Sequence, residues 1–469
     1  MKKTTIALIV TTALAGCGGS GDQQTVTRAP TPGSLTFTYP ADSTSPGGDQ
    51  PGVTSTVPTT APVFLRFNKS IDTPLTDLPD ALTLKDATGN EVTLTDVMFT
   101  GEDKMGLAAK PDKALAPGTS YTLTAEGLQV GGAPVSLTAD GIKFKTAPAT
   151  SGPLLSQTEG TGFELARTIP DGGSDYPVTD FTTFRLQFTE PVDPQSVVYG
   201  QTIRLTDQAG EPVNAEVYVK DHRVTVDPEG YLDPAQTYNL TVTSGIKSAL
   251  LGDTLSEDHT LTFNPVDSRS PTGKRQIMAQ VAESIPGQLP LTGADYNSVN
   301  LSSLLLGPNN PTSVTGTVFA ELGFIPRFEA AGQSIPLRID RGTLLTGSSV
   351  VVKVAGAVPA GFESEAVEVR FLSDANGFLM PNPYTDAVDA PRVLELYIDM
   401  ALNTGNTVAN GALGQQLMHV QLVGTAIVED GKLSIEAVGV IEPDVMGIDT
   451  ASGLISFKLN GFRNVEDAP

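Results

Sequence analysis

One segment of this chain is repeated, and the repeat limits the possible folds more than any other feature. Residues 65–72 (LRFNKSID) are similar to residues 186–193 (LQFTEPVD), and at the same offset residues 82–89 (LTLKDATG) are similar to residues 203–210 (IRLTDQAG). A sequence that recurs within one chain normally forms the same structural unit each time. We therefore expect two copies of one domain, over residues 34–148 and 153–266.

Each copy has the pattern of short strands joined by turns. Leu65 and Phe67 alternate with polar residues, as in a strand with one buried face. In the DATG and DQAG segments an aspartate can brace a turn and a glycine can take a positive φ. Tyr121 and Tyr238 begin later alternating runs, where a tyrosine can bury its ring and bond its hydroxyl back to a turn. Both copies are therefore expected to consist of β-structure.

The residues that the copies share also resemble a known family. Beyond the segments above, the copies match at proline, leucine, tyrosine and phenylalanine positions, namely Pro111/Pro228, Leu115/Leu232, Pro117/Pro234, Tyr121/Tyr238, Leu123/Leu240 and Phe144/Phe263. Together with residues 188–193 (FTEPVD), this pattern resembles the SbsA-type bacterial Ig-like domain of S-layer and other surface proteins. The first copy departs from it at Asn68-Lys69-Ser70. The resemblance implies two tandem Ig-like β-sandwiches, a module that serves as spacer, adhesin part or enzyme appendage.

A different pattern begins at about residue 270. Strand-like runs are expected at residues 314–321, 335–339, 350–354, 367–372, 393–400, 419–428, 433–441 and 454–459. Asp430-Gly431 between two long alternating runs indicates a hairpin. Residues 274–283 are expected to form a short helix, and residues 286–313 to be irregular. Residues 270–469 are thus predicted to be a larger antiparallel β-sandwich or jelly-roll-like domain, so the whole chain is expected to be all-β.

The N-terminus has the features of a targeting segment. Lys2 and Lys3 precede a short apolar run that ends in Leu14-Ala15-Gly16-Cys17. This ending resembles the lipobox of bacterial lipoproteins, which implies cleavage before Cys17 and lipid on its sulfur. The alternative is an ordinary secretory signal. We expect a signal peptide over residues 1–16, a lipidated Cys17 with a flexible tether over residues 17–33, and, since residue 18 is not aspartate, an outer-membrane lipoprotein that faces the periplasm or the cell surface.

Charge and composition exclude several classes of partner. The formal net charge of −24 repels phosphate backbones and anionic head groups, so nucleic-acid binding is not expected. Cys17 is the only cysteine, which leaves no thiol for a disulfide, a nucleophile or a zinc–sulfur site once it carries lipid. The chain has no tryptophan, which counts against sugar chemistry. The membrane is therefore expected to be reached through the lipid anchor alone.

The search for catalytic, cofactor-binding or metal-binding residues identifies none. Gly16, Gly18 and Gly21 fit a dinucleotide fingerprint but follow no strand and straddle the cleavage site. The histidines (His222, His259 and His419) are scattered, and His419 is expected to be half-exposed on a strand. Residues 374–377 (DANG) are expected to form a hairpin turn, with a calcium loop as the weaker alternative. Two carboxylate pairs, Glu363/Glu365 and Asp386/Asp389, are expected to be acidic loop residues.

The expected role is therefore binding or structural, as in an adhesin-like or envelope scaffold protein. The Ig-like modules would act as spacers, and residues 270–469 would bind an unknown protein or glycan. The alternative is an enzyme of unrecognised type with its active site in residues 270–469.

Overall fold

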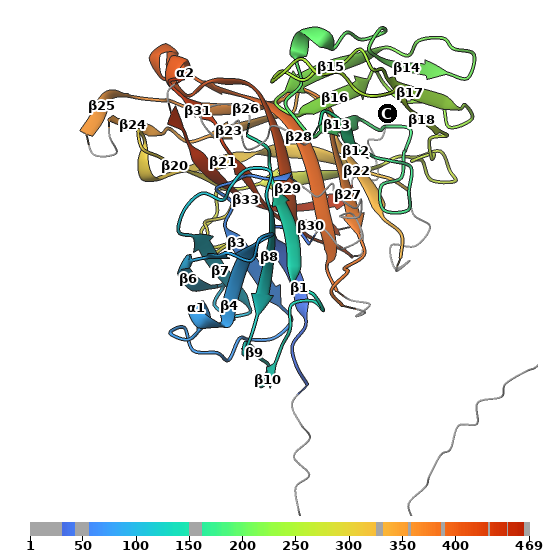
Figure 1. The fold of residues 1–469 in the computed structure, drawn as a ribbon. Coiled ribbons are helices and arrows are strands. Elements are labelled where there is room, and N and C mark those ends of the chain that lie inside the picture. Colours follow the sequence, from blue (N-terminus) through green and yellow to red (C-terminus); the bar gives the residue numbers. More distant parts are fainter. Residues whose placement is uncertain are drawn as a thin grey trace, which may run out of the picture.

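The computed structural model describes residues 31–42, 56–149, 162–324, 332–354, 358–385, 390–429, 432–447 and 449–463 (Figure 1). The all-β prediction is confirmed, since the α-helices of these residues are only α1 (Leu78–Ala81) and α2 (Thr407–Leu413). No helix in the described part of the chain is long and apolar enough to cross a membrane. The predicted signal peptide and Cys17 lie outside the described residues.

The first repeat (residues 34–148) forms two main sheets. One has the order β1-β3-β7-β6, from β1 (Leu35–Tyr39), β3 (Val63–Phe67), β6 (Leu94–Thr100) and β7 (Gly106–Pro111). The other has the order β2-β11-β8-β4-β5, from β2 (Thr56–Val57), β4 (Leu82–Asp86), β5 (Glu91–Val92), β8 (Ser120–Ala125) and β11 (Ile142–Thr146). A small hairpin joins β9 (Gln129–Val130) to β10 (Ala133–Pro134). Leu65, Leu84 and Leu123 are fully buried between the main sheets.

The second repeat (residues 153–266) has the same strand order in one sheet, while its other sheet has three strands where that of the first repeat has five. One sheet runs β12-β13-β16-β15, from β12 (Leu165–Ile169), β13 (Phe184–Phe188), β15 (Ala215–Lys220) and β16 (Arg223–Pro228). The other runs β14-β17-β18, from β14 (Ile203–Asp207), β17 (Tyr238–Val242) and β18 (His259–Phe263). β1-β3-β7-β6 of the first repeat thus corresponds to β12-β13-β16-β15 of the second.

The predicted tyrosine contacts are present in both repeats. The Tyr121 hydroxyl accepts a hydrogen bond from the backbone N–H of Ala116 at 2.8 Å, and the Tyr238 hydroxyl accepts one from that of Asp233 at 3.0 Å. Each tyrosine therefore ties its strand to the turn before it, as the sequence pattern predicted.

The predicted aspartate turns also match. Asp86 accepts hydrogen bonds from the backbone N–H groups of Thr88 and Asn90, and Asp207 does the same for Ala209 and Glu211, each at 2.9 Å. Gly89 and Gly210 follow at φ 89° and 86°, a conformation that glycine adopts without strain.

The C-terminal part forms one antiparallel sheet of eleven strands. They are β19 (Gln276–Ala282), β20 (Ser298–Ser303), β21 (Gly307–Leu322), β22 (Ile335–Ile339), β23 (Leu344–Gly347), β26 (Val367–Phe371), β27 (Ala375–Met380), β28 (Arg392–Thr404), β29 (Gln415–Glu429), β30 (Lys432–Ile441) and β33 (Ser452–Arg463). Because β19 pairs with both β33 and β21, the sheet closes on itself, and we call it the closed sheet. The large antiparallel domain expected here is thus a single curved sheet around one interior.

The long strands divide the closed sheet into two halves. Along β28, one end pairs with β27 and the other end with β26. In the same way β21 pairs first with β20 and β23, and then with β19 and β22. One half of the closed sheet is therefore built from β20, β23 and β26, and the other from β19, β22 and β27.

Two hairpins extend the half that contains β20, β23 and β26. They join β24 (Val351–Val354) to β25 (Val358–Glu363) and β31 (Asp444–Val445) to β32 (Asp449–Thr450). Helix α2 lies at the same end, next to β31 (Figure 1).

Three local predictions for this region were wrong. The segment expected to be helical contains strand β19, in which every second residue is buried. Two of these buried residues are Gln276 and Gln280, so the sequence does not show the alternation of apolar and polar residues that identifies a strand. The segment expected to be irregular contains β20 and the start of β21. The expected turn at residues 374–377 runs into β27, where Asn376 and Gly377 pair with β22 and β28. Long-range pairing overrides the local turn signal there.

Other strand predictions are confirmed. β22 spans the predicted residues 335–339, and β26, β28, β29, β30 and β33 each contain most of their predicted runs. β29 and β30 pair up to Glu429 and Lys432, so they flank the predicted Asp430-Gly431 turn, whose own residues lie outside those described.

Both repeats pack on the outer surface of the closed sheet, on different sides (Figure 1). The core of the first repeat includes Leu289, Leu291, Val423, Val438 and Val440 of the C-terminal part. The second repeat packs Ile169 and Tyr176 against Phe378, Met380 and Tyr397.

Candidate functional site: an apolar cavity

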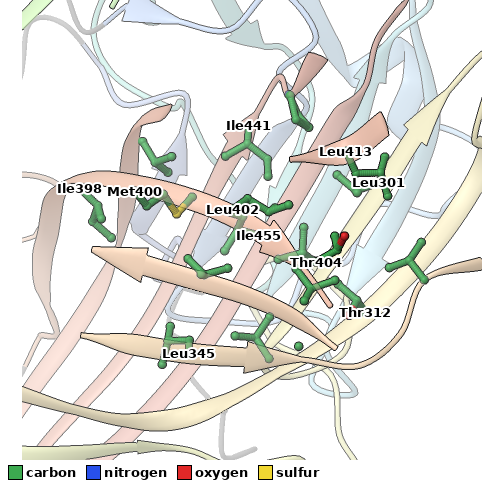
Figure 2. A pocket seen from close by; sticks show the side chains of 18 of the residues that line it. Leu301, Thr312, Leu345, Ile398, Met400, Leu402, Thr404, Leu413, Ile441 and Ile455 are labelled. Atoms are coloured by element: carbon green, nitrogen blue, oxygen red, sulfur yellow. The ribbon is translucent and has the colours of Figure 1, made fainter. Parts of the chain in front are cut away.

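An apolar cavity lies inside the closed sheet, in the half built from β20, β23 and β26. The cavity has a volume of about 50 Å³. Figure 2 shows side chains from several strands and from helix α2 surrounding it, among them Leu301, Leu345, Ile398, Met400, Leu402, Leu413, Ile441 and Ile455. Among the described residues that line it, only Thr312 and Thr404 carry a polar side-chain atom.

The alternation of β28 explains the apolar interior. Ile398, Met400 and Leu402 line the cavity, while Leu394 and Leu396 continue the same face of the strand into the other half. In a strand, alternate residues point to the same side, so one face of β28 supplies five apolar side chains to the interior. The strand-like run expected at residues 393–400 contains most of this face.

The two halves of the interior differ in their lining residues. In the half built from β19, β22 and β27, the core includes Met278, Leu337 and Leu379. In the half with the cavity, β26 contributes Val367 and Val369, and larger residues such as Leu345 and Phe371 line the same space.

The two hydroxyl groups in the cavity already have partners. Thr312 donates a hydrogen bond to the carbonyl of Ser348 at 2.7 Å, and Thr404 donates one to the carbonyl of Asn406 at 3.0 Å. Their protons are therefore not available to a ligand. The cavity can offer a ligand apolar contact, whereas a charged group placed there would lose its hydration without gaining a partner.

The opposite face of β28 meets the second repeat through polar groups. Glu395, Tyr397 and Asp399 alternate with the interior residues, and all three are buried. Arg185 of β13 forms an ion pair with Asp399, and the side chains of both are at least 93% buried. Its guanidinium also donates to Asn376 at 2.8 Å and to the carbonyl of Asp374 at 2.8 Å.

A second part of this interface centres on Glu395. The hydroxyls of Tyr176 and Tyr397 donate to the Glu395 carboxylate at 2.9 and 2.8 Å. Burial raises the pKa of Tyr176 and of Tyr397, and the negative charge of Glu395 raises them further. The guanidinium of Arg167 lies 4.7 Å from the centre of the Tyr176 ring. These contacts fix the second repeat on the closed sheet through charge-assisted hydrogen bonds.

His419 lies at the edge of the same interface. Its side chain is only 8% exposed, so the expectation that it is half-exposed was wrong. Its Nδ1 contacts the Asp399 carboxylate. Burial alone would raise the pKa of Asp399, but the positive charges of Arg185 and His419 outweigh burial and hold this pKa well below its ordinary value. Asp399 is therefore an ionised carboxylate that joins the two parts of the chain.

A polar crevice of about 370 Å³ adjoins His419. Its lining includes Lys220, His222, Arg223 and Glu442, from the second repeat and the closed sheet. The crevice thus brings together His222 and His419, while His259 lies elsewhere, on β18. In the described part of the chain, no three histidine, cysteine, aspartate or glutamate side chains are grouped so that they could hold a metal ion.

The remaining residues considered from the sequence do not line the cavity or lie outside the described chain. Glu363 and Glu365 are exposed. Asp386, Asp389, Cys17 and the glycines of the fingerprint-like segment lie outside the described residues. Sequence reasoning did not identify the cavity. The apolar face of β28 was the available signal, but a hollow interior depends on strands that are far apart in the sequence.

Comparisons with known proteins bear on both the repeats and the cavity. Residues 159–264 match the family model of the bacterial Ig-like domain. The chain is 33% identical over 493 aligned residues to the alkane uptake protein B of Marinobacter nauticus. The match covers 98% of this chain and 44% of that protein, so the chain spans less than half the length of this relative.

Two solved structures show weak similarity. An L,D-transpeptidase from Mycobacterium tuberculosis is 15% identical, with 47% of this chain and 88% of that chain covered and a TM-score of 0.16. Domains 1–6 of the surface layer protein SbsC are 8% identical, with 93% and 67% covered and a TM-score of 0.19. With TM-scores this low, these structures do not describe the arrangement of this chain.

Proposed function

We propose that this protein binds an aliphatic hydrocarbon chain in the cavity of the closed sheet. The observation that carries the proposal is the composition of the cavity wall, which is apolar except for two threonines whose protons are already donated. A dry apolar cavity of this kind takes up apolar ligands in preference to water. The similarity to a protein named for alkane uptake supports the same ligand class.

The wall favours a plain hydrocarbon over a chain with a polar head inside the cavity. Each buried CH₂ group stabilises the complex by about 0.8 kcal/mol. A carboxylate or hydroxyl at the same position would cost several kcal/mol, since it would find no donor there. The cavity therefore suits alkanes better than the protein or glycan ligand that the sequence suggested.

The lining of the cavity extends along one strand. Between Ile398 and Thr404 it includes alternate residues of β28 over roughly 20 Å of strand, at about 3.4 Å per residue. Because the cavity of about 50 Å³ is smaller than a long alkane, binding requires the lining leucines and Met400 to move aside. Methionine is suited to such adjustment because its unbranched side chain is flexible.

The rest of the chain would support and locate this site. In this proposal both repeats are bacterial Ig-like domains, over residues 34–148 and 153–266, that brace the closed sheet of residues 270–469 from the side. The residues that hold the second repeat in place, such as Arg185 and Asp399, have a structural role, and the protein is not an enzyme.

The proposal also includes anchoring of the protein to the outer membrane by lipid on Cys17. Cys17→Ser should leave the protein unlipidated, and recoverable in a soluble fraction or still carrying its signal peptide. Normal processing and membrane fractionation of this variant would refute the anchor without affecting the proposal on ligand binding.

A pair of matched substitutions tests the binding site. Val369 lines the cavity, while Val318 faces the filled half of the same interior. Val369→Phe should fill the cavity and weaken hexadecane binding at least tenfold, with little change in melting temperature. Val318→Phe should bind hexadecane as the wild type does but lose about 1–3 kcal/mol of stability, because it overpacks a filled region. Wild-type affinity in Val369→Phe, or no binding by the wild type, would refute the proposal.

A further inference from the structure

We infer that hydrocarbon enters the cavity through a cap at the hollow end of the closed sheet, and that this cap first contacts hydrocarbon at its interface with water. The inference rests on the proposed function. The cap consists of three connections: the turn at residues 304–306, helix α2, and residues 442–447 and 449–451 with strands β31 and β32.

These connections meet over the cavity. The backbone N–H of Leu305 donates to the Asp449 carboxylate at 3.0 Å, and that of Met446 donates to the carbonyl of Ala412 at 2.8 Å. Each connection also supplies a lining residue, namely Leu306, Leu413 and Val445. The three connections are therefore joined to one another at this end of the cavity.

Helix α2 is held in this cover by few apolar contacts. Its buried residues are Ala409, Ala412 and Leu413, and only Leu413 has a large side chain. Asn406 caps the helix by accepting hydrogen bonds from the N–H groups of Val408 and Ala409 at 2.9 and 3.2 Å. The helix can thus keep its own structure while it moves outward, and that movement withdraws Leu413 from the cavity wall.

The outer surface of the cap carries apolar side chains. Leu304 is 80% exposed, Val408 61% and Met446 57%, one on each connection. Met446 has a φ of 56°, a conformation for which glycine or asparagine is the usual residue. An exposed methionine side chain in this backbone conformation does not stabilise the fold. Its apolar character therefore points to contact with an apolar partner.

Charge indicates which apolar partner fits. Asp444 of the cap is exposed, and the whole chain has a net charge of −24. An anionic lipid surface would repel the cap, whereas the surface of liquid hydrocarbon presents no anionic head groups. The structure thus favours a hydrocarbon–water interface as the surface from which the ligand is taken.

The experiment measures the rate of hexadecane uptake and the affinity for hexadecane separately. The full chain is mixed with an emulsion of hexadecane droplets, and the rate of hexadecane transfer is measured, together with the dissociation constant for dissolved hexadecane. One triple variant carries Leu304→Ser, Val408→Ser and Met446→Ser. The matched control carries Leu75→Ser, Met98→Ser and Leu251→Ser, at positions on the repeats that are 49%, 53% and 65% exposed.

The cap variant should transfer hexadecane at least fivefold more slowly than the wild type, with a dissociation constant within twofold. The control should match the wild type in both measurements, and Leu304→Ser alone should cause a smaller slowing. Equal transfer rates in the two triple variants would overturn the inference while leaving the proposed function intact. A loss of affinity that accounts for the slower transfer, or faster uptake from anionic lipid vesicles than from droplets, would also overturn it. Absence of binding by the wild type would instead reject the proposed function.

Discussion

At the scale of single residues, Arg185 connects two parts of the chain that the sequence treats separately. It lies on β13 in the second repeat, and its partners Asn376, Asp374 and Asp399 belong to the closed sheet. Its sequence context, in an alternating strand of an Ig-like pattern, does not distinguish a residue at an interface from one in solvent. The partners are about 200 positions away, so no local pattern could have predicted this contact.

Removing this guanidinium should be costly. Arg185→Met would leave the Asp399 carboxylate buried with only His419 and the Ser373 hydroxyl beside it, and breaking a buried ion pair typically costs about 3–5 kcal/mol. Arg269→Met is the control, because the ion pair of Arg269 with Asp267 is exposed and should contribute less than about 1 kcal/mol. Urea unfolding of both variants measures the difference. Equal losses in the two would show that Arg185 does not hold the interface.

His222 should make stability depend on pH. Burial lowers the pKa of His222 well below its ordinary value, and the positive charges of Arg223 and His419 lower it further. The folded state therefore keeps His222 neutral, while the unfolded state binds a proton below about pH 6.5. The stability that neutral His222 contributes is present above that pH, and falls by up to about 1.4 kcal/mol per pH unit as the pH decreases.

The comparison of the wild type with His222→Gln isolates this effect. Burial raises the pKa of Asp227 to about 6, and the charge of Asp374 raises it too, so Asp227 contributes stability that is lost as the pH rises through 6. The contribution of Asp227 therefore changes with pH in the opposite direction to that of His222. The wild type and His222→Gln both contain Asp227, so its contribution cancels in the comparison. Thermal unfolding between pH 7.5 and pH 5 should show a steeper loss for the wild type. Parallel curves would mean that the pKa of His222 is the same in the folded and unfolded states.

At the scale of elements, the sequence predicts strands well where one face is uniformly apolar. β22 and β28 were identified because each has such a face. β19 was missed because Gln276 and Gln280 occupy buried positions, and β27 because Asn376-Gly377 is normally a turn signal. In both cases, pairing with distant strands determines the structure, and the local pattern does not report it.

Helix α2 allows a test of a single element. Gly411 is exposed within α2, and a Cβ atom there would meet no other atom within 4 Å. Gly411→Ala should stabilise the protein by roughly 0.5–1 kcal/mol, because alanine loses less backbone entropy in a helix. Gly414→Ala is the matched control, since its Cβ would lie 2.5 Å from the Asn410 carbonyl oxygen, and this variant should be destabilised. Melting temperatures that change in the same direction for both variants would contradict this description of the helix.

At the scale of the whole molecule, the closed sheet was less predictable than the repeats. The repeats share segments that the sequence displays directly, and their strand orders agree. Closure of the large sheet depends on β19 reaching both β21 and β33, across much of the C-terminal part. The cavity depends on this closure, because its lining residues come from strands that are far apart in the sequence. The sequence could therefore show an apolar strand face but not the space that it surrounds.

The central claim is that the interior of the closed sheet holds hydrocarbon, and methyl NMR of ¹³C-labelled methionine tests it most directly. Met400 lines the cavity, while Met278 lies fully buried in the filled half of the same interior. On addition of hexadecane, the Met400 methyl resonance should shift and show magnetisation transfer from the ligand, and that of Met278 should stay in place. A Met400 resonance that does not change when hexadecane is bound, or a change confined to exposed methionines such as Met98, would contradict the claim.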